Sequence, residues 1–181
     1  MIYGDRIRFR APEQEDLPVF VRWLNDPEVR AGISLYLPMS LANEEKWFRS
    51  MLERPQDEHP MCIECKEEGG WKLIGNCGFF EAQPIVRSAE FGIMIGEKDY
   101  WNKGYGTEAV QLLIKHGFET LNLNRISLRV FETNPGAIRS YEKAGFIQEG
   151  SHRQEHYQDG RFIDVIHMSI LRSEWDDTDK Q

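Results

Sequence analysis

The sequence has no apolar run that approaches the about 18 residues of a membrane-spanning helix, only three cysteines, and no excess of positive charge. Its start, Met1 to Arg6, lacks the apolar segment of a secretory signal, so we expect a cytoplasmic protein without a membrane partner. An odd number of cysteines in 181 residues argues against a disulfide framework. With 30 acidic and 22 basic residues, the net charge of −8 argues against a nucleic-acid binder, which normally carries a basic face, and agrees better with a cationic small partner.

The composition of the chain is that of a folded globular protein. Hydrophobic residues make up 40% of the chain and aromatic residues 12%, which is enough for a real core and excludes wholesale disorder. The length suits one domain, and no repeat or low-complexity linker interrupts it. We therefore expect a single domain over residues 1–175 and a polar tail over 176–181.

Cys62 and Cys65 have the C-x-x-C spacing of redox and zinc pairs. No second pair follows, and the surrounding residues indicate a strand rather than the start of a helix. Residues three apart on a strand point to opposite faces, so we expect these thiols to pack in the strand and not to converge.

Hydrophobic periodicity predicts the order of elements. Asn25 to Pro27 should end the first helix, Val29 to Ser40 should form a loop, and the Asp159-Gly160 pair should turn a hairpin. We expect strands at 6–10, 61–66, 71–80, 89–95 and 126–131 and on both sides of 159–160, and helices from 13, over about 42–52, over 106–121 and over 135–144.

The glycine-rich run Trp101 to Ala109 lies between a strand and an amphipathic helix. Glycines at such a junction let backbone approach a ligand, and the first N–H groups of the helix can bind an anion. Gly104 and Gly106 lack the third glycine of a dinucleotide motif, and Lys103 precedes its glycine instead of following it as in a P-loop. A plain tight turn remains an alternative.

A second motif begins at Asn134-Pro135, which supplies a helix cap and a favoured first-turn residue. Seven residues later, Tyr141 returns to the same helical face and is followed by Glu142-Lys143-Ala144-Gly145-Phe146. With both motifs present, the chain resembles the GNAT superfamily of acetyl-coenzyme-A-dependent N-acetyltransferases. Through Ala89 to Ile95 it is most similar to the ribosomal-protein alanine and spermidine acetyltransferases.

The resemblance implies an α+β fold with α/β/α layers, in which helices flank a mixed, mostly antiparallel sheet. It implies acetyl transfer from acetyl-CoA to a primary amine, with Tyr141 as general acid and Glu90 or a water chain as the route to a base. The family loop often has Gln or Arg where this chain has Trp101, which removes one side-chain contact and keeps the backbone donors. The implied cofactor-binding residues are Ile93, Met94, Ile95, Trp101, Asn102, Lys103, Gly104, Tyr105, Gly106, Thr107, Asn134, Ala137, Arg139 and Tyr141.

Each role has a structural alternative. Tyr141 fits a core position with its hydroxyl at the rim, Asn134 fits a helix cap, and Glu90 fits an ordinary ion pair on a strand. Asp26, Glu28 and Glu44 near the loop could attract a cation, although most such charges are solvated helix ends.

No metal is expected, because His152 and His156 lack an obvious third ligand. The acceptor stays open among protein N-termini, polyamines, amino sugars and aminoglycosides, and a homodimer stays open too. A non-catalytic acyl-CoA-binding or sensor module is the alternative function.

Overall fold

The computed structural model describes residues 1–178, the last three of them by their backbone only. Contacts divide the chain into two compact units. Unit 1 comprises residues 1–79 and 93–109, and unit 2 comprises residues 80–92 and the chain from 110 onward. The single domain predicted from the sequence therefore stays a prediction, and the two units are described separately.

The strands hydrogen-bond in the order β1-β2-β3-β4-β5-β6-β8-β7, which confirms the predicted mixed sheet. Only β5 and β6 are recorded as parallel among the described pairs, so the sheet is mostly antiparallel. The strands are β1 (Ile2–Tyr3), β2 (Ile7–Arg10), β3 (Met61–Glu67), β4 (Gly70–Gln83), β5 (Ser88–Ile95), β6 (Arg125–Phe131), β7 (Ile147–Gln158) and β8 (Arg161–Leu171).

Helices and short helical turns complete the described chain. The helices are α1 (Leu17–Asn25), α2 (Pro27–Arg30), α3 (Leu41–Leu52), α4 (Tyr105–Lys115), α5 (Pro135–Lys143) and α6 (Arg172–Thr178). The short turns are η1 (Gln14–Asp16), η2 (Gln56–Glu58), η3 (Lys98–Tyr100) and the π-helical η4 (His116–Thr120). None of the described helices is long and apolar enough to cross a membrane.

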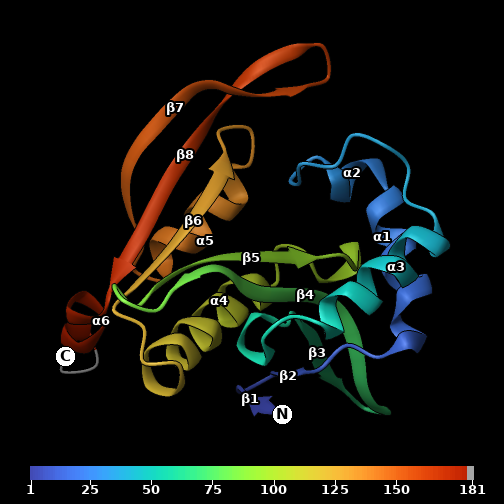
Figure 1. Cartoon of the computed structure of the whole chain (residues 1–181), viewed down its shortest axis with the longest axis horizontal. Helices are drawn as coiled ribbons and strands as arrows, with labels where there is room; N and C mark the ends of the chain where they lie inside the picture. The colour runs from blue at the N-terminus through green and yellow to red at the C-terminus, as the bar shows by residue number, and fades with distance from the viewer. Residues whose placement is uncertain (179–181) are drawn as a thin grey trace. The chain divides into compact units, whose positions relative to one another are not determined.

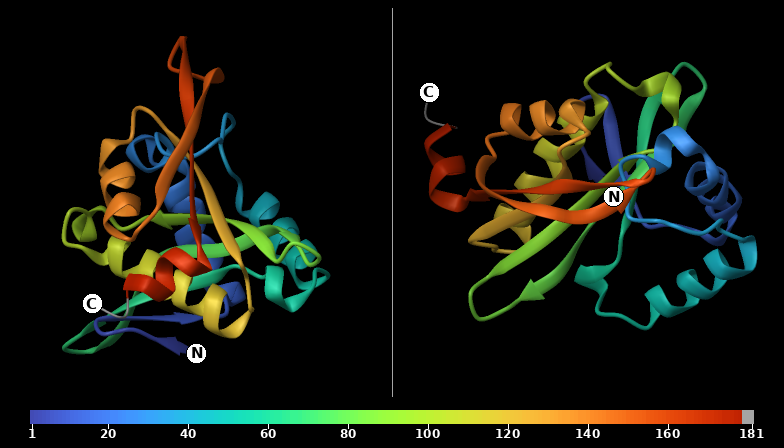
Figure 2. Two further views of the ribbon diagram at one scale, coloured as in Figure 1. Left: turned by 90° about the vertical axis from the view of Figure 1, so that its left-hand side faces the viewer. Right: turned by 90° about the horizontal axis from the view of Figure 1, so that it is seen from above.

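In unit 1, α1, α2 and α3 gather around one apolar cluster (Figures 1 and 2). Leu17, Phe20 and Trp23 of α1 are buried there beside Cys62 of β3, as the periodicity of α1 predicts. Below the cluster, Arg10 of β2 bridges Asp16 and Glu64 with hydrogen bonds of 2.6–2.8 Å. This pairing lets two carboxylates be buried at the edge of an apolar core.

Cys62 and Cys65 are free, buried residues of β3, as the strand prediction requires, and Cys77 of β4 is free and buried as well. Burial raises the pKa of all three thiols above the ordinary value. Thiols that stay protonated are poor nucleophiles and poor metal ligands. These residues therefore serve packing.

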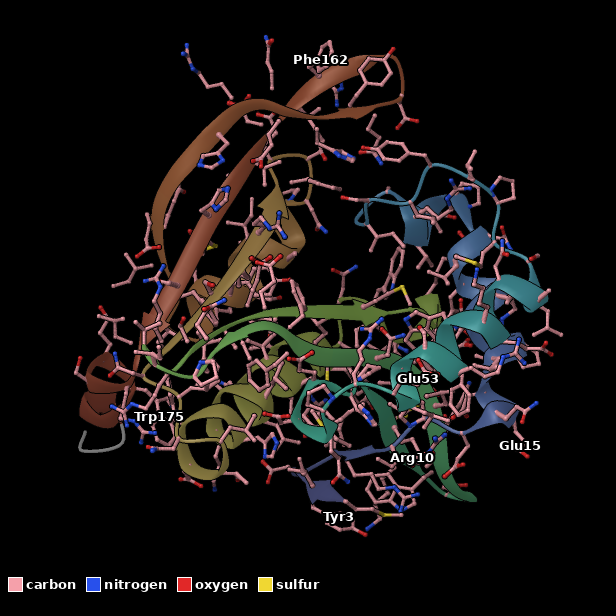
Figure 3. All side chains as sticks on the ribbon, viewed as in Figure 1. Tyr3, Arg10, Glu15, Glu53, Phe162 and Trp175 are labelled. Carbon is pink, nitrogen blue, oxygen red and sulfur yellow. The ribbon has the colours of Figure 1, made fainter. Side chains whose placement is uncertain are left out.

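In unit 2, β8 pairs with β6 on one side and with β7 on the other, and the long β7–β8 hairpin carries Phe162 near its tip (Figures 1 and 3). Ile126, Leu128 and Ile170 are buried along these strands. The hairpin turn has Asp159 at φ 51° and Gly160 at φ 82°, the left-handed pair that the Asp-Gly signal predicts.

Three elements were not expected. β1 is only two residues long. Residues 27–30 form the helix α2, although the sequence predicted a loop from Val29 onward. Asp26 caps this helix by accepting from the backbone N–H of Glu28 at 2.9 Å, and Pro27 begins its first turn. The predicted tail begins at 176, yet the backbone of α6 continues to Thr178, with Trp175 packed on Phe118 (Figure 3). Residues 179–181 lie outside the described part.

Candidate functional site

The glycine-rich run forms a bent connection between η3 and α4 in unit 1. Asn102 has φ 60° and Gly104 has φ 84°, so the chain turns twice through the left-handed region before α4 begins at Tyr105. The carbonyl of Gly104 accepts the N–H of Glu108 at 3.0 Å, which starts the helix. The N–H groups before Glu108 in this first turn have no intrahelical acceptors, and donors of this kind at a helix start can bind an anion.

Gly106 keeps this end uncovered for a different reason from Gly104. A Cβ at Gly106 would meet only Ile95 Cγ1, at 3.9 Å, so the protein itself leaves room there. At Gly104 the positive φ is the constraint, since a side chain in that conformation is strained. The two glycines therefore shape the turn and also leave the helix start accessible.

Arg6 braces this connection, a role that no pattern in the sequence indicates. Its Nε lies 2.8 Å from Glu108 Oε2, its Nη1 donates to the carbonyl of Lys103 at 3.2 Å, and its guanidinium stacks 4.5 Å over the ring of Tyr105. The sequence placed Arg6 only at the start of an expected strand, 6–10. A contact across about a hundred residues has no local signal in the sequence.

Trp101 attaches the same connection to the end of β5. Its indole N–H donates to the carbonyl of Ile95 at 2.7 Å. The strand segment Ile93 to Ile95 lies against the bare backbone of β4, where a Cβ on Gly75 would stand 2.2 Å from the carbonyl oxygen of Met94. Trp101 thus fixes the loop to the strand, and its predicted contact with a cofactor stays a prediction.

In unit 2, the second motif begins with the expected helix cap. Asn134 Oδ1 accepts from the backbone N–H of Ala137 at 3.1 Å, and Pro135 occupies the first turn of α5. The carboxamide NH₂ of Asn134 offers donor chemistry besides this cap. Arg139 is exposed on the same helix. The cap confirms the local structural role of Asn134, and its ligand role remains open.

Tyr141 is buried against two aromatic rings of unit 2. Its ring lies 5.8 Å from Phe91 of β5 and 6.0 Å from Phe146, both edge to face, and its exposed fraction is 8%. This burial raises the pKa of Tyr141 to about 12. The phenol therefore holds its proton throughout the neutral range.

Glu90 lies on β5 of unit 2, two residues before Gly92. Its carboxylate accepts from Arg129 Nε at 2.7 Å, and the second partner of Arg129, Glu81, is 3.9 Å away. The ion pair raises the pKa of Arg129. The contacts of Glu90 thus agree with the interpretation as an ordinary ion pair on a strand.

The acidic residues near the 31–40 loop already have partners or are buried. Lys98 Nζ lies 2.8 Å from Asp26 and 2.9 Å from Glu28, so a cation of the protein itself already pairs with both carboxylates. Glu44 is buried in α3, and burial raises the pKa of its carboxyl group. Of the three, only Glu44 combines burial with a raised pKa.

The histidines of the β7–β8 hairpin do not pair as His152 with His156, the two that the sequence suggests as a pair. His156 stacks on Phe131 with ring centroids 4.2 Å apart, whereas the ring of His152 lies 3.9 Å from that of His167. Glu155 lies between these two imidazoles. The partner of His152 is therefore on the opposite strand, which the spacing of His152 and His156 could not indicate.

The family comparison agrees with both motifs. The model of the acetyltransferase (GNAT) domain matches residues 6–147, a span that includes the loop at 101–107 and the whole Asn134 to Phe146 motif. An uncharacterized N-acetyltransferase, p20, from Bacillus licheniformis is 34% identical over 176 residues, which cover 96% of this chain and 97% of that protein.

Spermidine acetyltransferases are also similar to the chain. The spermidine N(1)-acetyltransferase of Vibrio cholerae is 37% identical over 109 residues, or 60% of this chain and 62% of that protein. A crystal structure of a spermidine N-acetyltransferase from the same species, in complex with CoA and spermine, has a TM-score of 0.85 at 29% identity and covers 95% of this chain and 99% of that one. On this match of sequence and fold, the chain belongs to the GNAT acetyltransferase family and is an N-acetyltransferase.

Proposed function

We propose that this enzyme transfers the acetyl group of acetyl-CoA to a primary amine of a polyamine. The observation that carries the proposal is the similarity along almost the whole chain to a spermidine N-acetyltransferase crystallised with CoA and spermine. The net charge of −8 supports a cationic acceptor, since it attracts rather than repels a polyammonium ion.

In unit 1, the residues proposed to hold acetyl-CoA do so mainly through backbone. The start of α4 offers N–H donors with Gly104 and Gly106 leaving them uncovered, which suits a pyrophosphate. Asn102, Tyr105 and Thr107 complete this segment, and Lys103 adds a positive charge. The β5 backbone at Ile93, Met94 and Ile95 is proposed to donate to the pantetheine arm and to the thioester oxygen as negative charge develops on it.

In unit 2, we propose that Asn134, Ala137 and Arg139 contact the cofactor and that Tyr141 acts at the thioester sulfur. The amine nitrogen bonds to the carbonyl carbon and the C–S bond breaks. The nitrogen releases one proton to solvent, and the sulfur takes up one. A free thiol has a pKa near 8.5, whereas that of buried Tyr141 is about 12, so complete transfer from the phenol is unfavourable by about 3–4 pKa units. Tyr141 therefore acts best by donating a hydrogen bond that stabilises the departing sulfur, and the proton that the sulfur finally holds comes from solvent.

Glu90 is proposed to act on the acceptor side. An alkylamine is mostly protonated at neutral pH and must lose a proton before it attacks. Because Glu90 is paired with Arg129, it attracts and orients the ammonium group more readily than it removes a proton, and a water chain is the better route to solvent. Glu90→Gln should raise the KM of the amine more than it lowers kcat if this assignment is correct.

The proposal is tested by following CoA thiol release with a panel of amines. The panel contains spermidine, spermine, a peptide with a free N-terminus, an amino sugar and an aminoglycoside. We expect the highest kcat/KM with a polyamine. Faster turnover of any other acceptor would overturn the polyamine assignment, and binding of acetyl-CoA without transfer to any amine would favour the non-catalytic module.

A further inference from the structure

Three side chains that the proposed acetyl transfer does not use converge on the β7–β8 hairpin of unit 2. Nδ1 of His152 lies 3.1 Å from Oε2 of Glu155, and Nε2 of His167 lies 3.4 Å from the same oxygen. One ligand atom from each residue lies within 4.8 Å of the other two. His152 and Glu155 belong to β7 and His167 belongs to β8.

An irregularity in β7 builds this cluster. His152 pairs with Val165 and His156 with Ile163, so four steps along β7 face two steps along β8. In a regular strand, residues three apart point to opposite faces, and Glu155 would point away from His152. The two extra residues in β7 bring Glu155 back to the face of His152.

The irregularity is held in place by its neighbours. Gln154 adopts a left-handed φ of 55°, and its backbone N–H donates to Asp164 Oδ1 of β8 at 2.9 Å. His167 pairs with Gly150, which makes it a diagonal neighbour of His152 across the two strands. Both imidazoles are therefore carried by one paired hairpin, and the strained turn fixes the carboxylate between them.

We propose that His152, Glu155 and His167 bind a divalent transition-metal ion, with Zn²⁺ as the best match. Zn–N bonds of about 2.0–2.1 Å and Zn–O bonds of about 2.0–2.2 Å at tetrahedral angles place ligand atoms about 3.3–3.5 Å apart. The two N–O distances of 3.1 and 3.4 Å are close to this spacing without any rearrangement of the strands. Two imidazoles select Zn²⁺, Cu²⁺ or Ni²⁺ over Mg²⁺ and Ca²⁺.

The surroundings allow an ion to enter. The side chains of His152 and Glu155 are 62% and 37% exposed, so a water molecule can occupy the fourth position. Arg129 is the register partner of His167 on β6, but its charge is offset by the ion pair with Glu90 and by the nearby Glu81. Among the three ligands, the carboxylate of Glu155 supplies the negative charge that attracts the ion.

A bound ion would connect β7 to β8 across the irregular part of the hairpin. Because the three ligands converge only in the folded hairpin, binding should stabilise the folded state in proportion to the ion concentration. This inference does not depend on acetyl transfer, and its test needs no enzyme assay.

The test is a titration of the untagged protein with Zn²⁺ in competition with a chromogenic chelator, together with Co²⁺ absorption spectra. We expect one ion per chain, a visible Co²⁺ band of tetrahedral type and a Tm that rises with Zn²⁺. His152→Gln and His167→Gln should each weaken binding by more than about 100-fold, beyond the about 10- to 100-fold typical of a lost outer-shell partner.

His59→Gln is the matched control, because it removes a histidine of unit 1 that bonds only the carbonyl of Arg54 among the recorded contacts. It should bind Zn²⁺ as the unchanged protein does. Urea unfolding without metal checks that each variant is folded. The proposal is overturned if the unchanged protein binds no more Zn²⁺ than His167→Gln, or if binding falls equally in His59→Gln.

Discussion

The proposed cofactor segment of unit 1 and the α5 region of unit 2 are built in opposite ways. In unit 1 the loop offers backbone N–H groups. Arg6 contacts the loop at Lys103 and the helix start at Glu108, and Trp101 holds the loop to β5. In unit 2 the chemical group is a side chain, the Tyr141 phenol, whose pKa is set by the rings and strands around it. A backbone site is sensitive to conformation and added bulk, and a side-chain site is sensitive to the loss of a few atoms.

The largest expected effect is on the side-chain site. Tyr141→Phe removes one hydroxyl and keeps the edge-to-face packing on Phe91. We expect kcat to fall by about 10²- to 10³-fold, with the dissociation constant of CoA nearly unchanged, because the hydroxyl stabilises the leaving sulfur and not the bound cofactor. Steady-state thiol release and calorimetric binding measure the two quantities. An unchanged kcat would remove Tyr141 from the reaction.

The backbone site should respond to a change that the side-chain site would tolerate. Gly104→Glu forces a side chain into a φ of 84°, at a cost of about 1–2 kcal/mol, and adds a carboxylate beside the proposed phosphate site. We expect CoA affinity to fall by about 10- to 100-fold or more from these two terms combined.

The matched control is Gly69→Glu, which adds the same charge where no atom lies within 4 Å of the new Cβ and φ is not positive. It should leave CoA affinity unchanged. If both variants lose affinity equally, net charge and not the loop would be the cause.

A pH measurement isolates the burial of Tyr141. Its pKa is about 12 in the folded state and near 10 in the unfolded chain. The contribution of this group to the unfolding free energy is therefore complete below about pH 10 and is lost as the pH rises towards about 12. The loss amounts to about 1.4 kcal/mol at pH 11. Urea unfolding between pH 9 and 11 should show the unchanged protein losing more stability than Tyr141→Phe, and parallel curves would contradict the burial effect.

The smallest expected effect separates the two roles of Asn134. Asn134→Ala removes the cap on Ala137 and should lower the unfolding free energy by about 1 kcal/mol. Asn134→Asp keeps a capping oxygen and should retain that stability, while it loses the NH₂ donor proposed for the cofactor. A lower CoA affinity in Asn134→Asp with unchanged urea stability would support the ligand role, and equal CoA affinity would leave Asn134 as a cap alone.

The sequence predicted most elements because their signals are local. Apolar spacing fixed α1, α3 and α4, the Asn134-Pro135 cap fixed the start of α5, and Asp159-Gly160 fixed the hairpin turn. α2 and α6 were missed because each is short and overlaps a segment that predicted an end, Asp26-Pro27 in one case and the polar chain end in the other.

The candidate site was predictable only where its residues lie within a motif. Gly104 and Tyr141 became candidates in this way, and their roles stay predictions. Arg6 was missed because its partners at 103 and 108 are distant in sequence, and Glu155 was missed because the irregular pairing of β7 reverses the face that ordinary strand periodicity assigns to it. Register irregularities depend on the partner strand, so a single strand does not reveal them.

The most direct test of the account is a calorimetric titration of CoA into Tyr141→Phe and Gly104→Glu side by side, with kcat measured on the same samples at saturating acetyl-CoA and spermidine. The account predicts a crossed result, in which Tyr141→Phe binds CoA normally and turns over slowly, while Gly104→Glu binds CoA weakly and approaches normal turnover once saturated. If both variants lost affinity and turnover together, the separation of a backbone binding site in unit 1 from a side-chain catalytic site in unit 2 would be contradicted.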